Sequence, residues 1–211
     1  RKQMDKLLRF RKDFKEIYVG GRWWPIEASF EDINPSDNSL WATVPDVEVK
    51  DVQNAITSAD HAFENWSNLK FNERSHYMIK IAEVLEENKM DIVKALRAEA
   101  GGWFGKAMFE AGYLPELFHA AAAANYQAIG EVIPSDSGKF SMAVRRPIGV
   151  ISVISPWNFP CILTARGMAF ALAAGNTVVL KPSEETPYTG GLLWAEIFEE
   201  AGVPGGVLNV V

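Results

Sequence analysis

Three short apolar runs in the last third of the chain, separated by two helical patterns, constrain the fold more than any other feature. The runs are rich in β-branched residues, which favour strands, and lie at residues 150–154, 177–180 and 207–211. The first reads Val-Ile-Ser-Val-Ile, apolar except for Ser152, and stops at a Ser-Pro pair, which predicts a strand buried on both faces. Strands and helices that alternate this closely predict an α/β fold, with right-handed crossovers and a parallel sheet covered on both faces.

Two helices are predicted between these strands. Residues 161–174 are apolar almost all round, and Gly175 can take the left-handed conformation that ends such a helix. For the second helix, Thr186 is the predicted cap, Pro187 the first helical residue and Gly202 the residue past the end.

A parallel sheet of this kind binds ligands beyond the carboxyl ends of its strands. That edge carries residues 155–158 after the first strand and residues 181–184 after the second. The first loop lacks Gly-x-Gly-x-x-Gly, so the usual close cradle for a pyrophosphate is absent. Glu184 is nonetheless placed to hydrogen-bond the ribose hydroxyls of a dinucleotide, and Lys181 is placed to share that task. The alternative is that Lys-Pro-Ser-Glu is a polar turn without a ligand.

The two loops also carry a resemblance to a known family. Residues 155–160 read Ser-Pro-Trp-Asn-Phe-Pro, and residues 175–187 read Gly-Asn-Thr-Val-Val-Leu-Lys-Pro-Ser-Glu-Glu-Thr-Pro. This pair of motifs, at this separation, resembles the aldehyde dehydrogenase superfamily of NAD(P)-dependent enzymes. Shorter matches at residues 18–23, 34–35, 42–45, 62–66 and 146–150 extend the resemblance over nearly the whole chain.

The resemblance implies a fold and its division along the chain. Residues 1–128 would form the first part of a Rossmann-like cofactor-binding domain, as hairpins followed by helices. Residues 129–147 would form a protruding oligomerisation β-hairpin, and residues 148–211 the βαβαβ part of the cofactor domain. The catalytic domain would be absent, and we expect the chain to be the amino-terminal part of a protein more than twice this length.

Composition excludes several classes of function. The chain has 211 residues, 48% hydrophobic and 23% charged, enough for a sizeable core. Its net charge of -6 argues against general attraction to nucleic acid or anionic membranes. The single cysteine rules out an intrachain disulfide, and no apolar run is long enough to cross a bilayer. We therefore expect a cytoplasmic protein without nucleic-acid or membrane partners.

The first two-thirds of the chain predict hairpins and then helices. Residues 17–24, with Gly-Gly at the centre, predict a hairpin, and residues 29–34 and 40–44 predict two more strands. Apolar residues at helical spacing between residues 49 and 96 predict core-facing helices, and a further helix is expected at residues 109–125. The basic, amphipathic start of the chain is interpreted as a solvated surface helix. No metal-binding spacing of His, Cys or carboxylates is present in the sequence.

The predicted oligomerisation hairpin shows an alternation of its own. Apolar Phe140, Met142 and Val144 alternate with neighbouring residues, which suits a strand available for pairing between chains. With the resemblance, this alternation leads us to expect a homodimer or homotetramer.

The resemblance assigns one catalytic residue, Asn158. Oxidation of an aldehyde through a cysteine thiohemiacetal and thioester needs a hydrogen-bond donor for the oxyanion, and the side-chain amide of Asn158 would be that donor. An amide donates without a charge, so it stabilises the developing negative charge without binding the carboxylate product too tightly. The alternative is that Asn158 only caps the following helix, although both roles can be held together.

The resemblance also assigns the coenzyme contacts. Trp157 and the backbone of residues 154–156 would line the channel on the nicotinamide side, and residues 181–184 would bind the adenosine side. The predicted cofactor-binding residues are Ile154, Ser155, Pro156, Trp157, Lys181, Pro182, Ser183 and Glu184. The carboxylate of Glu184 would repel a 2′-phosphate, so NAD is preferred, while Lys181 keeps NADP possible.

Cys161 is interpreted as structural. It lies in a first helical turn, where the helix dipole lowers the pKa of a thiol, yet the family has an apolar side chain at this position. Arg166 resembles members that act on aromatic aldehydes, and with Leu163 it is expected to face the substrate tunnel. Gly167 stands where many members have a lysine that is sometimes assigned a charge-relay role.

The nucleophilic cysteine and the general-base glutamate of the family would lie beyond Val211, so the chain alone is expected to be inactive. A strand ending at Val211 would also leave an unpaired parallel edge. Two alternatives are a non-catalytic interaction module with this fold and an acylating semialdehyde dehydrogenase that passes its thioester to coenzyme A or phosphate. The rest of the protein would discriminate them.

Overall fold

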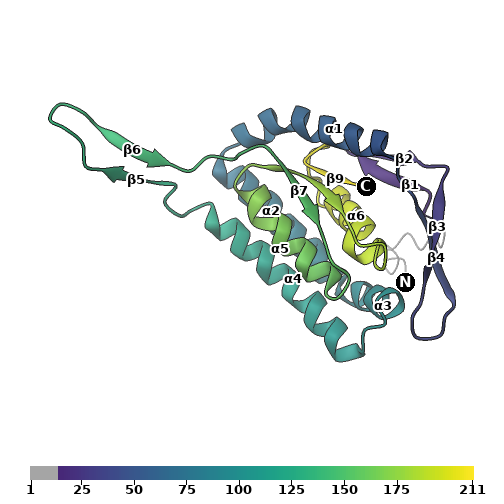
Figure 1. Ribbon diagram of the computed structural model, residues 1–211. Helices are drawn as coiled ribbons and strands as arrows, with labels where there is room; N and C mark the ends of the chain where they lie inside the picture. The colour runs from purple at the N-terminus through teal and green to yellow at the C-terminus, as the bar shows by residue number, and fades with distance from the viewer. Residues whose placement is uncertain (1–13) are drawn as a thin grey trace.

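The computed structural model describes residues 14–211, and Figure 1 shows their arrangement. The start of the chain, interpreted above as a surface helix, lies outside the described residues. Within them, a five-stranded sheet lies between layers of helices, and one long hairpin projects from the body (Figure 1).

The central sheet is parallel on one side and antiparallel on the other, in the order β2-β1-β9-β8-β7. Its parallel strands are β7 (Val150–Ile154), β8 (Thr177–Lys181) and β9 (Leu208–Val210), and its antiparallel strands are β1 (Glu16–Val19) and β2 (Arg22–Pro25). The predicted parallel strands and the first hairpin are thus confirmed. Gly20 and Gly21, with φ of 65° and 78°, make the tight turn between β1 and β2.

We expected the last strand to leave an unpaired parallel edge, and this prediction is wrong. β1 pairs antiparallel with β9, with Tyr18 opposite Val210, so β9 has neighbours on both sides. The side chain of Asn209 supports this junction, because its Oδ1 accepts a hydrogen bond of 2.9 Å from the amide of Gly20. The outer strand on the parallel side is β7 instead.

β7 is also less buried than the sequence indicated. We predicted burial on both faces, but Val153 is its one buried residue and Ile154 is 75% exposed. The physical reason is position, since β7 is the last strand of the sheet among residues 14–211 and only β8 pairs with it. An apolar run therefore predicted the strand correctly and its surroundings incorrectly.

Helices cover both faces of the sheet, as predicted (Figure 1). One face is covered by α1 (Val49–Asn68), which packs over β8 and β9. The other is covered by α5 (Pro160–Ala173) and α6 (Leu193–Glu200), with α2 (Phe71–Glu87), α3 (Lys89–Glu99) and α4 (Phe104–Ala124) packed outside them. The main core lies on this second side and includes Phe118, Met168 and Trp194.

Two helix boundaries differ from the predicted ones. α4 begins at Phe104, five residues before the predicted start at Phe109, and Gly105 lies inside the helix. Thr186 does not cap a regular α-helix, since the segment opens as a π-helical turn, η1 (Tyr188–Leu192), before α6. The Thr186 hydroxyl is buried and has no hydrogen-bond partner within the described residues. Gly175 and Gly202 end α5 and α6 at positive φ, as predicted.

Two further hairpins stand apart from the central sheet. β3 (Ser29–Ile33) pairs with β4 (Leu40–Pro45), and β5 (Gly130–Ile133) pairs with β6 (Ser141–Val144). The β5–β6 hairpin extends away from the body (Figure 1), and its apolar side chains Val132, Phe140 and Met142 are exposed. These strands lie within the predicted segment at residues 130–144.

Candidate functional site

The candidate site is at the carboxyl ends of β7 and β8, which lie side by side. Ile154, the last residue of β7, is opposite Lys181, the last residue of β8. The amide of Ser155 continues the pairing by donating a hydrogen bond of 3.1 Å to the carbonyl of Lys181. The two turns predicted to bind a coenzyme, residues 155–158 and 181–184, therefore start from adjacent positions on one edge of the sheet.

The first turn presents three exposed residues between buried ends. Pro156, Trp157 and Asn158 are exposed, whereas Ser155 is only 4% exposed and its Oγ makes no hydrogen bond within the described chain. The alternative role of Asn158 as the helix cap is not supported. Phe159 occupies the N-cap position, and no hydrogen bond to the Asn158 amide is found among residues 14–211. The amide is thus free to contact a ligand.

The amino end of α5, just after this turn, is capped by a carboxylate from α4. Glu110 Oε1 accepts hydrogen bonds from the amides of Cys161 at 2.8 Å and Ile162 at 3.2 Å. Lys106 Nζ lies 3.4 Å from Glu110 Oε2 and 4.5 Å from the centroid of the Phe159 ring. Burial raises the pKa of Glu110, while Lys106 and the two amides oppose that shift. Sequence reasoning missed this cap, because Glu110 is about fifty residues away along the chain.

The amide groups at the start of η1 are also held by a buried carboxylate. The carboxylate of Glu99, at the end of α3, accepts hydrogen bonds from the amides of Tyr188 at 2.6 Å and Thr189 at 2.8 Å, and a short one from the Thr189 hydroxyl. Burial and the nearby Asp32 raise the pKa of Glu99 well above its ordinary value. Burial likewise raises the pKa of Asp32 to about 6. In both crossover segments, a buried carboxylate therefore accepts hydrogen bonds from the first backbone amides. The amides of Cys161 and Ile162 at the start of α5 already have this partner and are not available to a ligand.

The second turn lies beside a small cavity. Residues 181–184 line a cavity of about 150 Å³, together with Asp46, Leu192 and Val211. Lys181 and Glu184 are exposed, and Lys181 Nζ is 3.1 Å from the carbonyl of Pro182. The first turn does not line this cavity. The structure thus brings the two turns together at their start, but only the second turn lines this cavity.

Cys161 is built as a structural residue. Its side chain is fully buried, and Sγ donates a hydrogen bond of 3.2 Å to the carbonyl of Thr189. Burial, together with the nearby Glu110 and Glu99, raises the pKa of the thiol well above its ordinary value. The helix dipole does not produce a thiolate here, so the structural interpretation of this residue holds.

Of the two expected tunnel residues, Arg166 contacts α4. Leu163 is half-buried, and Arg166 is exposed with its guanidinium carbon 5.5 Å from the centroid of the Tyr113 ring. Tyr113 in turn stacks on Phe109, at a centroid distance of 6.1 Å and an angle of 21°. Phe109 was predicted only as the first residue of a helix, and Tyr113 was not predicted as a site residue. The available signal was two aromatic residues four apart within the predicted helix, Phe109 and Tyr113.

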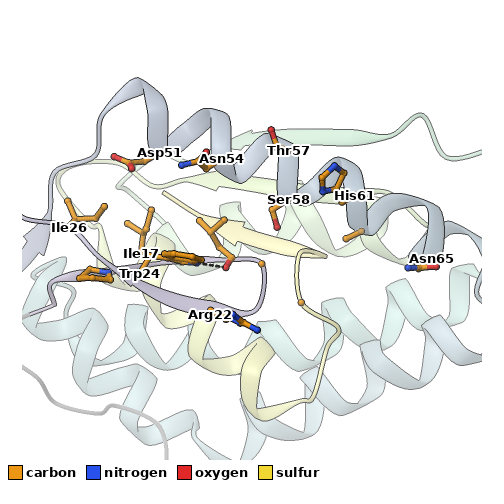
Figure 2. Close-up of a pocket in the computed structure, with 15 residues that line it drawn as sticks. Ile17, Arg22, Trp24, Ile26, Asp51, Asn54, Thr57, Ser58, His61 and Asn65 are labelled. Atoms are coloured by element: carbon orange, nitrogen blue, oxygen red, sulfur yellow. Dashed lines mark hydrogen bonds between the residues drawn. The ribbon is translucent and has the colours of Figure 1, made fainter.

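A larger cavity lies elsewhere in the molecule. An open cavity of about 780 Å³ lies between α1 and the β1–β2 hairpin. Figure 2 shows Ser58 and His61 on the helix, opposite Ile17 and Trp24 on the hairpin. None of the predicted site residues lines it, and it is not formed by the carboxyl-end turns where such folds bind ligands. Within the described part of the chain, no group of three or more His, Cys, Asp or Glu could hold a metal ion.

Comparisons with known proteins identify the family of the chain. The model of the aldehyde dehydrogenase family matches residues 23–211, and the chain belongs to this family. One relative, vanillin dehydrogenase of Corynebacterium glutamicum, is 39% identical over 94% of this chain and 42% of its own length. Another, mitochondrial succinate-semialdehyde dehydrogenase of Rattus norvegicus, is 35% identical over 93% of this chain and 38% of its own.

A solved structure confirms the architecture. The chain is similar to an NAD-dependent benzaldehyde dehydrogenase from Corynebacterium glutamicum, with a TM-score of 0.89 and 38% identity. The match covers 93% of this chain and 43% of that one. The predicted Rossmann-like α/β fold is therefore confirmed, and the chain spans about two-fifths of the length of these relatives. Among the helices of residues 14–211, none is both long and apolar enough to cross a membrane.

Proposed function

We propose that this chain is the coenzyme-binding part of an NAD(P)-dependent aldehyde dehydrogenase that oxidises an aldehyde to a carboxylic acid. In this proposal residues 1–128 and 148–211 form the coenzyme domain and residues 129–147 the oligomerisation hairpin. The nucleophilic cysteine and the general base would come from outside the chain, since Cys161 is buried and protonated. Family membership and the adjacent turns at the ends of β7 and β8 support the proposal.

Asn158 is proposed as the oxyanion donor. The observation that carries this assignment is the exposed, unused amide of Asn158, placed between a buried Ser155 and the capped start of α5. A donor held in this way is already oriented when negative charge develops on the carbonyl oxygen, so it loses little free energy to reorganisation. Trp157 and the backbone of residues 154–156 would lie along the nicotinamide side.

The residues of the second turn fit the nucleoside end of the coenzyme. Glu184 offers an exposed carboxylate to ribose hydroxyls and Lys181 an exposed ammonium, beside a cavity that Pro182 and Ser183 also line. The amides at the start of α5 do not fit a pyrophosphate, because Glu110 already accepts from Cys161 and Ile162. When bound, NAD(P) supplies the hydride acceptor. The carboxylate of Glu184 disfavours a 2′-phosphate and Lys181 partly offsets this, so we propose NAD as the preferred coenzyme, with NADP possible.

An aromatic aldehyde is the proposed substrate class. Arg166 on α5 contacts Tyr113 on α4, which stacks on Phe109, and Leu163 lies one turn before Arg166 on the same helix. Together the aromatic pair and Arg166 offer ring faces and a cation to an aryl group. The names of two relatives, vanillin dehydrogenase and benzaldehyde dehydrogenase, support this proposal. We also propose a cytoplasmic location, in which the single thiol stays reduced.

Asn158→Ala in the full-length protein tests the proposal. We expect turnover of a benzaldehyde-type substrate to fall by roughly a hundred- to thousandfold, with the Kd for NAD unchanged, because the amide contacts the carbonyl oxygen alone. Asn65→Ala, which removes an exposed amide beside the larger cavity, is the matched control and should keep full turnover. Turnover in Asn158→Ala within threefold of the wild type would exclude the assignment.

A further inference from the structure

α4 holds the amino end of α5 through two charged side chains one turn apart. Glu110 is fully buried and Lys106 is largely buried, and they form an i,i+4 ion pair with 3.4 Å between Nζ and Oε2. Neither residue belongs to the sheet edge or to the turns described above. Burial of a carboxylate costs free energy unless its oxygens accept hydrogen bonds or pair with a cation. The contacts of Glu110 therefore indicate its structural role.

The contacts of Glu110 are the first free amides of α5. Pro160 is the first helical residue and has no N–H, so Cys161 and Ile162 carry the amides that the helix itself cannot pair. Glu110 Oε1 accepts both, at 2.8 and 3.2 Å. A charged acceptor on backbone amides at the positive end of a helix makes stronger hydrogen bonds than a neutral one. The start of α5 is thereby fixed to α4 and not to a solvent-exposed cap.

The residue between Asn158 and α5 is held by the same pair. The ammonium of Lys106 lies 4.5 Å from the ring centroid of Phe159, a cation–π distance, while its other contact is the Glu110 carboxylate. On the opposite side of the turn, Ser155 is buried and its amide is bonded to Lys181. Residues 156–158 are therefore an exposed bridge of three residues between two fixed points.

We propose that Glu110, assisted by Lys106, is a positioning residue for Asn158: it fixes the start of α5 so that the amide stays aimed at the substrate carbonyl. This inference rests on the proposed function, in which Asn158 donates to the oxyanion. Glu110 touches neither substrate nor coenzyme, and it acts through the backbone of Cys161 and Ile162. An amide displaced by about 1 Å loses much of its effect on the transition state, because the reacting geometry tolerates little error.

The test compares Glu110→Ala, Glu110→Gln and Glu116→Gln in the full-length protein. We expect kcat at saturating NAD and benzaldehyde to fall at least tenfold in Glu110→Ala, with the Kd for NAD within twofold of the wild type. Glu110→Gln keeps an acceptor oxygen but not the charge, so its kcat should lie between that of the wild type and that of Glu110→Ala. Glu116→Gln alters an exposed carboxylate on the same helix and should keep kcat within twofold of the wild type.

Hydrogen exchange supplies a readout that needs no turnover. The amides of Cys161 and Ile162 should exchange at least tenfold faster in Glu110→Ala than in the wild type, and at the wild-type rate in Glu116→Gln. If the wild type oxidises no aldehyde, the proposed function fails, while exchange still decides whether Glu110 holds α5. Unchanged kcat in Glu110→Ala, or an equal fall in Glu116→Gln, would overturn the positioning role. Should Glu110→Ala not fold, Glu110→Gln and Lys106→Gln carry the same comparison.

Discussion

Gly191 is the position where a single added methyl group should disturb the second turn most. It lies in η1, where a Cβ would stand 2.5 Å from Cγ, 3.0 Å from Cβ and 3.1 Å from Cδ of Pro182. All three contacts are with a closed ring that cannot rotate away, and every residue of η1 is buried. Gly191→Ala must therefore shift Pro182, and with it the Lys181–Glu184 turn.

The size of the effect follows from two opposing contributions. Overpacking in a well-packed interior costs about 1–3 kcal/mol, and replacing glycine by alanine within a helix returns up to about 1 kcal/mol. We therefore expect Gly191→Ala to lower the free energy of unfolding by about 1–2 kcal/mol. Gly190→Ala is the matched control, because its Cβ would meet Pro182, Ser155 and Pro160 at 3.3, 3.4 and 3.6 Å, near ordinary contact distances. Its net effect should be about zero.

Urea denaturation followed by tryptophan fluorescence measures both variants, since Trp194 is fully buried in the helix that follows η1. Gly191→Ala should unfold at lower urea than Gly190→Ala, with an unchanged slope. A Gly191→Ala protein as stable as the wild type, or as stable as Gly190→Ala, would refute the close approach of η1 to Pro182.

Two further predictions concern the buried carboxylates and the projecting hairpin. Burial raises the pKa of Asp32 from 3.8 to about 6, so the stability that it contributes is present in full below pH 3.8 and lost as the pH rises through 6. The side chain introduced by Asp32→Asn stays neutral at every pH. The free energy of unfolding of Asp32→Asn minus that of the wild type should therefore rise by up to about 3 kcal/mol from pH 4 to pH 7. If denaturation gave the same difference at every pH, this prediction would be contradicted. Met142→Glu places a charge on the apolar face that Met142 shares with Val132, and should yield a smaller oligomer by light scattering. Ala143→Gln on the other face is the control, and an unchanged mass in Met142→Glu would argue against pairing through that face.

The sequence was most informative where a signal is local. β-branched runs located β7 and β8, and glycines located the turns at Gly20, Gly175 and Gly202, because backbone conformation there depends on one or two residues. The turns at the carboxyl ends of β7 and β8 followed from the strand order alone.

The interactions that the sequence did not reveal join distant segments. The carboxylates of Glu99 and Glu110 reach amides that lie 89 and 51 residues further along the chain. No spacing rule connects such pairs, and an isolated glutamate in a helix normally indicates a solvated face. The exposed edge of β7 and the pairing of β1 with β9 were missed for the same reason, since burial depends on neighbours from other parts of the chain.

A structure of the full-length protein with NAD bound tests the central claim most directly. We expect the adenosine ribose within hydrogen-bond distance of Glu184 and the nicotinamide beside Trp157, with the Asn158 amide directed at the space next to the nicotinamide. Coenzyme bound in the cavity between α1 and the β1–β2 hairpin, away from both turns, would contradict it.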